Sequence, residues 1–187
     1  IQKYDALLQH TTTANYPEFL TKASLEWFHG PMVAALKDQG LSSEWYYTTS
    51  TNRADKSISM GGTQPDTGRN VHGLKNTVSL LVETRGVGIG RLHAQRRVHA
   101  QVVAMTSALR SASEKAGPLE QVRSYDVKDT SAQACRDQII VNAAATPTQR
   151  DLTFLDPTSG EDRTTRVDWN SSLTLRTLQA RARPCGY

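Results

Sequence analysis

The chain has 187 residues, 37% of them hydrophobic, and 22 basic side chains against 18 acidic ones give a net charge of +4. This length fits one domain or one and a half, with a core of modest size. No apolar run approaches the roughly 18 residues that a membrane-spanning helix needs, so composition excludes that class.

The first forty residues carry helical patterns. The chain begins at Ile1 rather than methionine, so we expect it to be processed or cut from a longer polypeptide, and residues 4–9 to close a helix begun earlier. A second helix is predicted from Pro17, a favourable first helical residue. The apolar side chains of residues 19–36 follow helical spacing there. Gly30-Pro31 should kink or split this helix.

Two predicted strands follow, with a loop between them. Residues 44–51, Glu-Trp-Tyr-Tyr-Thr-Thr-Ser-Thr, are rich in the aromatic and β-branched types that favour strands. Glycine, proline and aspartate over residues 61–73 predict the loop. The apolar run from Val78 to Val82 is typical of a strand buried on both faces.

Glu83 directly follows that apolar run. An unpaired charge is costly to bury. We therefore expect the carboxylate at the carboxyl end of the strand, opening into the crevice where α/β sheets bind their ligands. There it is a candidate general base. The alternative is a structural carboxylate paired with Arg85 or with a cation on a helix.

A glycine-rich turn and a long helix come next. Gly86, Gly88 and Gly90 permit a tight turn, but they lack the spacing of a dinucleotide fingerprint. In the helix, four apolar residues recur at spacings of four, three and four, and we expect them to face a sheet; they are Val98, Val102, Met105 and Leu109. Strand, loop, strand and helix together indicate an α/β architecture.

Near Gly117-Pro118 the alternating helix and strand patterns give way to short β-rich runs. We therefore predict an α/β part over residues 1–116 and a β-rich module over 117–187. Turn clusters at 145–147 and 156–160 separate short β-rich runs in the module. An antiparallel meander or small sandwich would have this spacing; the runs are 138–143, 151–155, 164–169 and 173–178.

The two cysteines, Cys135 and Cys185, both lie within this module, fifty positions apart. Their wide separation argues against a zinc or thioredoxin-type motif. A disulfide between them is expected if the protein is exported, whereas two buried free thiols are expected in a cytosolic protein.

Few other residues are candidates for binding a substrate, a nucleic acid or a metal. Arg69 and Asn70, in the loop before the strand, could capture a carboxylate, or they could belong to a solvated turn. The basic run from Arg91 to His99 has no interleaved aromatic residues, so we expect a solvated helix face and no nucleic-acid partner. No histidine has metal-ligand spacing, and we expect all five at the surface or at helix caps; they are His10, His29, His72, His93 and His99.

One stretch carries a family resemblance. Leu80-Leu81-Val82-Glu83-Thr84-Arg85-Gly86, followed by Gly90-Arg91 and a long helix, is similar to the C-terminal part of zinc carboxypeptidases of the carboxypeptidase A type. In that family a strand ends in the glutamate of an E-x-R pattern and a helix follows. Gly68-Arg69-Asn70-Val71 and Arg96-Arg97-Val98-His99 resemble bacterial members. The resemblance covers residues 1–115.

The resemblance implies a three-layer α/β/α mixed-sheet peptidase domain, followed here by a small antiparallel β-rich module. Glu83 would be the general base that deprotonates a zinc-bound water for attack on the C-terminal peptide bond, and would later protonate the leaving amine. Arg69, Asn70 and Arg85 would contact the substrate carboxylate. The family's habits, with the two cysteines, also imply a periplasmic or secreted protein.

The family's zinc ligands and its mobile tyrosine have no counterpart in the expected places, and Tyr46 and Tyr47 are given no role. We therefore expect the zinc ligands in a missing N-terminal segment of the same enzyme, and this chain alone to be inactive. Two other readings stay open: a related zinc deacylase acting on N-acyl amino acids, and a non-catalytic binding module in which Glu83 is structural.

Overall fold

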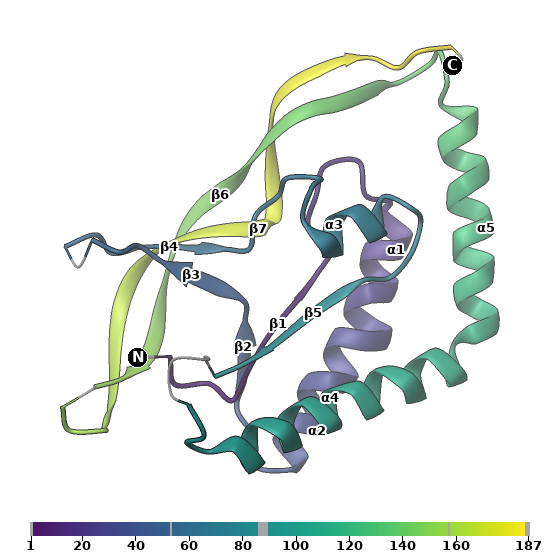
Figure 1. Cartoon of the computed structure of the whole chain (residues 1–187). Coiled ribbons are helices and arrows are strands. Elements are labelled where there is room, and N and C mark those ends of the chain that lie inside the picture. The colour runs from purple at the N-terminus through teal and green to yellow at the C-terminus, as the bar shows by residue number, and fades with distance from the viewer. Residues whose placement is uncertain (1, 53, 86–89, 157, 186–187) are drawn as a thin grey trace.

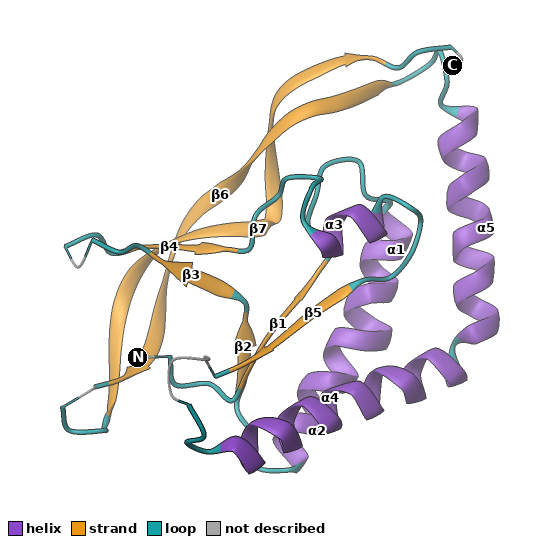
Figure 2. Ribbon diagram, in the orientation of Figure 1, coloured by secondary structure: helices purple, strands orange, loops and turns teal. Residues whose placement is uncertain are grey.

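The computed structural model describes residues 2–52, 54–85, 90–156 and 158–185, which form two mixed β-sheets with helices packed beside them (Figures 1 and 2). The predicted α/β class is confirmed. In chain order the elements are β1 (Ala6–His10), α1 (Glu18–Ala23), the π-helical turn η1 (Ser24–His29), α2 (Gly30–Asp38), β2 (Ser43–Trp45), β3 (Tyr47–Thr49), β4 (Ser57–Met60), α3 (Gly68–Gly73), β5 (Leu80–Thr84), α4 (Ala94–Glu114), α5 (Ala116–Ala132), β6 (Gln138–Leu155) and β7 (Asp162–Ala182).

Strand β1 lies at the centre of the first sheet, whose order is β2-β1-β5. It runs parallel to β2 and antiparallel to β5, and all five of its residues are buried. On one face Leu8 packs against α2 and α4, and on the other Leu7 packs against the second sheet. The helix end expected at residues 4–9 is therefore wrong, because this short apolar run is covered on both faces, as a central strand is.

The second sheet has the order β3-β4-β7-β6. Its largest part is the long β6–β7 hairpin, which extends from the lower left to the upper right of Figure 1. The predicted turn at 156–160 joins these two strands, with the amide of Gly160 donating to the carbonyl of Asp156. The four short runs predicted here are wrong, because each pair merges into one strand. The expected turn at 145–147 is a register shift within β6, an edge strand, where a proline is tolerated.

The first helical region is split as predicted. Between α1 and α2 the helix widens to a π turn, in which the amide of Gly30 donates to the carbonyl of Leu25, five residues earlier. Pro31 follows in the first turn of α2 and has no amide hydrogen to donate. A π turn is one way a helix accommodates such an interruption.

Helix α4 forms as predicted but is oriented differently. Its small residues Ala100 and Ala104, both fully buried, pack against the first sheet and α2. The predicted contact face is exposed instead: Val98, Val102, Met105 and Leu109, called here the α4 seam, are 62%, 54%, 59% and 70% exposed. The expectation that the α4 seam faces a sheet is wrong, because a close helix–sheet approach selects small side chains.

Strand β5 starts two residues later than predicted and lies at the edge of its sheet. Its residues are half-buried except Glu83, which is exposed. The expectation of burial on both faces is therefore wrong, because β5 pairs with β1 on only one of its sides within the described residues.

The β-rich C-terminal part begins after α5, which starts at Ala116. The predicted boundary after residue 116 stays a prediction, and β7 pairs directly with β4 of the first part. The expected disulfide between Cys135 and Cys185 is present, with the two Cα atoms 4.4 Å apart. Within the described ranges, no helix combines the length and the apolar character needed to cross a bilayer.

Candidate functional site

A buried polar network lies at the carboxyl end of β1. The side chain of Gln9 is fully buried, and its amide nitrogen donates to the hydroxyls of Thr12 at 2.8 Å and Ser172 at 2.9 Å. Its amide oxygen accepts a hydrogen bond from the backbone of Gly61 at 3.0 Å. This network ties β1, the loop after β4, and β7 to one another.

Helix α3 brings Arg69 and Asn70 to this network. Asn70 is fully buried; it accepts from the amide of Thr12 at 3.1 Å and donates to the carbonyls of Gly62 at 3.1 Å and Gln64 at 2.7 Å. Its amide group therefore fixes the loop at 62–64, to which the neighbouring Arg69 also donates. The Arg69 guanidinium donates from Nη2 to the Gly62 carbonyl at 2.5 Å, while its buried Nε has no partner among the described residues. Burial also lowers the pKa of Arg69.

Glu83 lies opposite Leu7 in the pairing of β5 with β1. Residues paired in this way share a face of the sheet, so Glu83 points to the side of Leu7, toward the second sheet. Its carboxylate is exposed and has no hydrogen bond or ion pair within the described part of the chain. Arg85, the partner expected in the structural alternative, instead donates to the carbonyl of Lys3.

Tyr46 is within electrostatic reach of both Glu83 and Arg69. The residue lies where the chain leaves β2 for β3, and its amide donates to the carbonyl of Leu8 at 2.9 Å. Burial raises the pKa of Tyr46, the negative charge of Glu83 adds to that rise, and the positive charge of Arg69 opposes it. Sequence reasoning gave this tyrosine no role. The alternation of side chains along 44–46 could have indicated that it shares a face with Glu44.

Two histidines lie away from this face, around Trp45. His29 stacks on the indole with ring centroids 4.0 Å apart, and His10 meets its edge at 5.8 Å. His10 is only 2% exposed, so its expected surface position is wrong: it ends the buried β1 strand. Burial lowers the pKa of both histidines to about 4, and for His10 the positive charges of His29 and Arg69 contribute.

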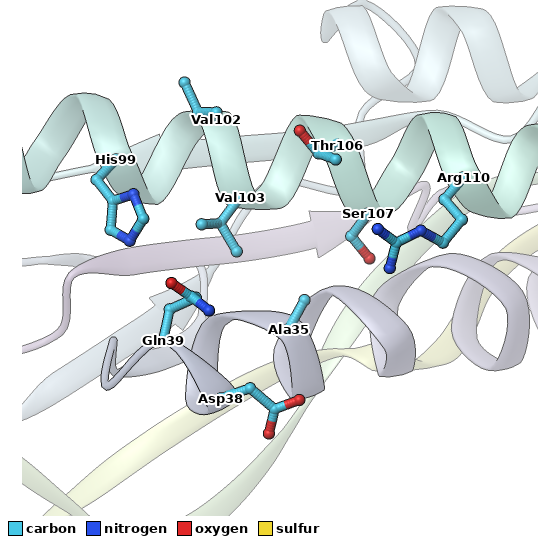
Figure 3. A pocket seen from close by; sticks show the side chains of 9 residues that line it. All are labelled: Ala35, Asp38, Gln39, His99, Val102, Val103, Thr106, Ser107 and Arg110. Carbon is cyan, nitrogen blue, oxygen red and sulfur yellow. The ribbon is translucent and has the colours of Figure 1, made fainter.

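A separate cavity of about 300 Å³ lies between α2 and α4 (Figure 3). None of the predicted site residues lines it. The lining residues are Ala35, Asp38, Gln39, His99, Val102, Val103, Thr106, Ser107 and Arg110. We therefore place the candidate site at Glu83, Tyr46 and Arg69 rather than in this cavity.

The side chains that could bind a metal do not converge. Across the described residues, no three His, Cys, Asp or Glu side chains are close enough together to hold an ion. Because β-strand side chains alternate, His10 points to the opposite face of the sheet from Glu83. A complete zinc site thus does not fit these residues. Gly86 and Gly88 of the predicted turn lie outside the described residues.

Comparison with known proteins gives a distant similarity over nearly the whole chain. The chain is 25% identical over 184 residues to "Probable carboxypeptidase 2" of Trichophyton verrucosum, covering 98% of this chain and 35% of that protein. It is 24% identical to "Carboxypeptidase 2" of Trichophyton equinum and of Trichophyton rubrum, covering 98% of this chain and 34% of each. The chain therefore spans about a third of the length of these relatives.

No family model matches the chain, and no solved structure is significantly similar to it. These relatives are fungal, so the resemblance to bacterial members stays a prediction.

Proposed function

We propose that this chain is the C-terminal part of a zinc-dependent carboxypeptidase in which Glu83 is the general base. The observation that carries the proposal is the state of the Glu83 carboxylate. It is exposed and without a partner among the described residues, and its negative charge contributes to the raised pKa of Tyr46. The similarity to proteins named carboxypeptidase 2 supports the same reaction class.

Each residue of the site has a chemical role in the proposal. Glu83 takes a proton from the attacking water and returns it to the leaving amine. Arg69 offers a guanidinium that can hold the terminal carboxylate of a peptide. Asn70, with its amide committed to the backbone, holds the loop that positions Arg69. Arg85, two residues beyond Glu83, is a second candidate for contact with the substrate carboxylate.

Zinc would act as a Lewis acid on the scissile carbonyl. Because the described residues supply no complete ligand set, we place the zinc ligands in a further, N-terminal part of the enzyme, and we expect this chain alone to be inactive. The Cys135–Cys185 disulfide supports a periplasmic or secreted location, since disulfides persist in oxidising compartments.

Glu83→Gln in the complete enzyme tests the proposal. The amide keeps the size of the side chain but cannot accept the proton, so we expect turnover of a C-terminal peptide substrate to fall about 100-fold or more. The thermal midpoint should not change, because the carboxylate has no described partner to lose. Glu114→Gln, at the exposed C-terminal end of α4, is the matched control and should retain full turnover.

Turnover by the complete enzyme and its Glu83→Gln variant also separates the proposal from its two alternatives, a deacylase and a non-catalytic binding module. A deacylase would cleave N-acyl amino acids faster than peptides. A non-catalytic binding module would show no turnover that depends on Glu83. Elemental analysis of the dialysed 187-residue chain should find almost no zinc, whereas one tightly held ion per chain would contradict the placement of the ligands outside it.

A further inference from the structure

Helix α4 has two faces of opposite character. Its buried face is made of small residues, including Ala100, Ala104 and Ser107. At about 100° per residue, the α4 seam is centred roughly 160° around the helix from that face. Figure 3 shows the contrast on one turn: Val103 points toward α2, whereas Val102 projects to the other side of α4. The apolar seam is thus left uncovered by the described chain.

The spacing of the α4 seam indicates what could cover it. Val98, Val102, Met105 and Leu109 follow intervals of four, three and four, the alternation of a coiled-coil contact. This is a narrower stripe than the one a helix turns toward a sheet. A single helix lying along α4 would therefore cover it, over a length of about 16 Å at 1.5 Å per residue.

The open edge of the first sheet adjoins the α4 seam. Strand β5 ends the order β2-β1-β5, so one of its sides has no neighbouring strand within the described ranges. Helix α4 lies against β5, with the side chain of Gln101 donating to the carbonyl of Val82 at 3.2 Å. An open hollow of about 380 Å³ connects the edge to the seam, lined by Thr84, Ala94, Arg97, Val98, Gln101 and Val102.

We propose that the β5 edge and the α4 seam form one interface, which binds a β-strand and an amphipathic helix from a further part of the same polypeptide. The inference rests on the proposed function, in which this chain is part of a longer enzyme. The relatives support this source, because the chain covers only 34–35% of their length.

The size of the surface favours a tethered segment over a second copy. One five-residue edge strand and four seam residues make a smaller contact than stable association between separate molecules usually requires. A segment joined to the chain needs less contact area, because tethering raises its effective concentration. A strand would also pair backbone groups on the open side of β5 other than the Val82 carbonyl, which already accepts from Gln101. Unpaired edge groups otherwise invite aggregation.

Hydrogen exchange tests the β5 edge. We would compare the 187-residue chain with the complete gene product that contains it, following the amides of Leu80–Thr84. We expect these amides to exchange at least tenfold more slowly in the longer protein. Equal exchange in the two proteins overturns the proposal, as does a gene product with no residues beyond these 187.

A pair of lysine variants tests the α4 seam. Val102→Lys should lower the thermal midpoint of the complete protein by several degrees but leave that of the 187-residue chain unchanged, since the side chain is exposed there. Thr106→Lys, at an exposed position about 70° around the helix from the centre of the α4 seam, should lower neither. A 187-residue chain that sediments as a dimer, and becomes a monomer with Val102→Lys, would identify a second copy as the occupant and overturn the proposal.

These readouts are independent of catalysis. If Glu83→Gln leaves turnover intact but the β5 amides are protected in the longer protein, the interface stands and the proposed reaction fails. If turnover is lost but the amides exchange equally, the reaction stands and the interface fails.

Discussion

Two carboxylates flank Leu7 on the same face of the first sheet, and they differ in whether they have an ion-pair partner. Glu44, opposite Leu7 on β2, receives Arg150 in a two-pronged ion pair, with N–O distances of 2.6 and 3.3 Å. Arg150 also stacks on Trp169 at 4.7 Å. Glu83, opposite Leu7 on β5, has no such partner among the described residues. The Glu44–Arg150 pair therefore joins the two sheets, whereas Glu83 takes no part in such a contact within the described chain.

At the same scale, we predict that Gly61→Ala destabilises the site by about 1–3 kcal/mol. A Cβ atom at this position would lie 2.6 Å from Oε1 of Gln9 and 2.7 Å from Nη2 of Arg69, so the buried hydrogen bonds there must break or shift. Urea unfolding measures the loss. Gly62→Ala is the control, because no atom lies within 4 Å of its Cβ position, and an equal effect of both variants would contradict the prediction.

The lowered pKa values of His10 and His29 predict acid sensitivity. Their pKa values of about 4 in the folded chain lie below the ordinary value of 6.5 that applies when it unfolds. The unfolded chain therefore binds more protons between these values, and stability should fall as the pH drops from 6.5 to 4. Unfolding free energies measured across this range should show the slope, and His29→Phe, which keeps a ring on Trp45, should reduce it. A flat profile would contradict the assignment.

At the scale of elements, the sequence predicts whether a segment is a helix or a strand better than it predicts which elements pack against that segment. The period of α4 was sufficient to predict a helix, but not which face is buried, because that depends on how closely β1 and α2 approach. Likewise, the sequence predicts the β-rich runs of the hairpin but also a turn at Pro147, which in the structure lies within β6. Only the pairing partner reveals that it lies on an edge strand, where its missing amide costs little.

The disulfide should stabilise the hairpin and its connection to α5. Cys135 and Cys185 are separated by 50 positions, a loop for which chain entropy predicts about 4 kcal/mol of stabilisation. The double variant Cys135→Ser/Cys185→Ser should lose a large part of this and exchange its amides faster in Gln138–Ile140. The part of the hairpin paired with β4 should stay protected. Equal acceleration along the whole hairpin would indicate global unfolding instead.

At the scale of the whole molecule, residues from both predicted parts form one core. Leu7, Tyr47 and Ile58 of the first part pack with Leu152 and Trp169 of the second. We therefore expect the chain to unfold in one transition, and Leu152→Ala, at a position 1% exposed, to cost about 2–5 kcal/mol.

Denaturation followed by both tryptophan fluorescence and far-UV circular dichroism checks this expectation. Leu178→Ala, at a position 56% exposed, should change stability by less than about 0.5 kcal/mol. Two separate transitions, of which Leu152→Ala lowers only one, would favour independent folding of residues 1–116 and 117–187.

The candidate site was predictable only in part, because some of its residues come together only in the folded chain. Glu83 could be found locally, because a carboxylate that ends an apolar run is anomalous wherever it occurs. Tyr46 could not, because its relation to Glu83 and Arg69 arises where the chain passes from one sheet to the other. Gln9 was also missed, since its partners Gly61 and Ser172 are 52 and 163 positions away.

The Cys135–Cys185 bond also makes β6, the hairpin turn and β7 part of a closed covalent ring. The exposed turn at 158–161 lies within it, far along the chain from either cysteine. A protease that nicks this turn would therefore release no fragment until a reductant is added. Nicked and intact protein would run alike in size under non-reducing conditions, so routine purification could carry a mixture of the two without revealing it.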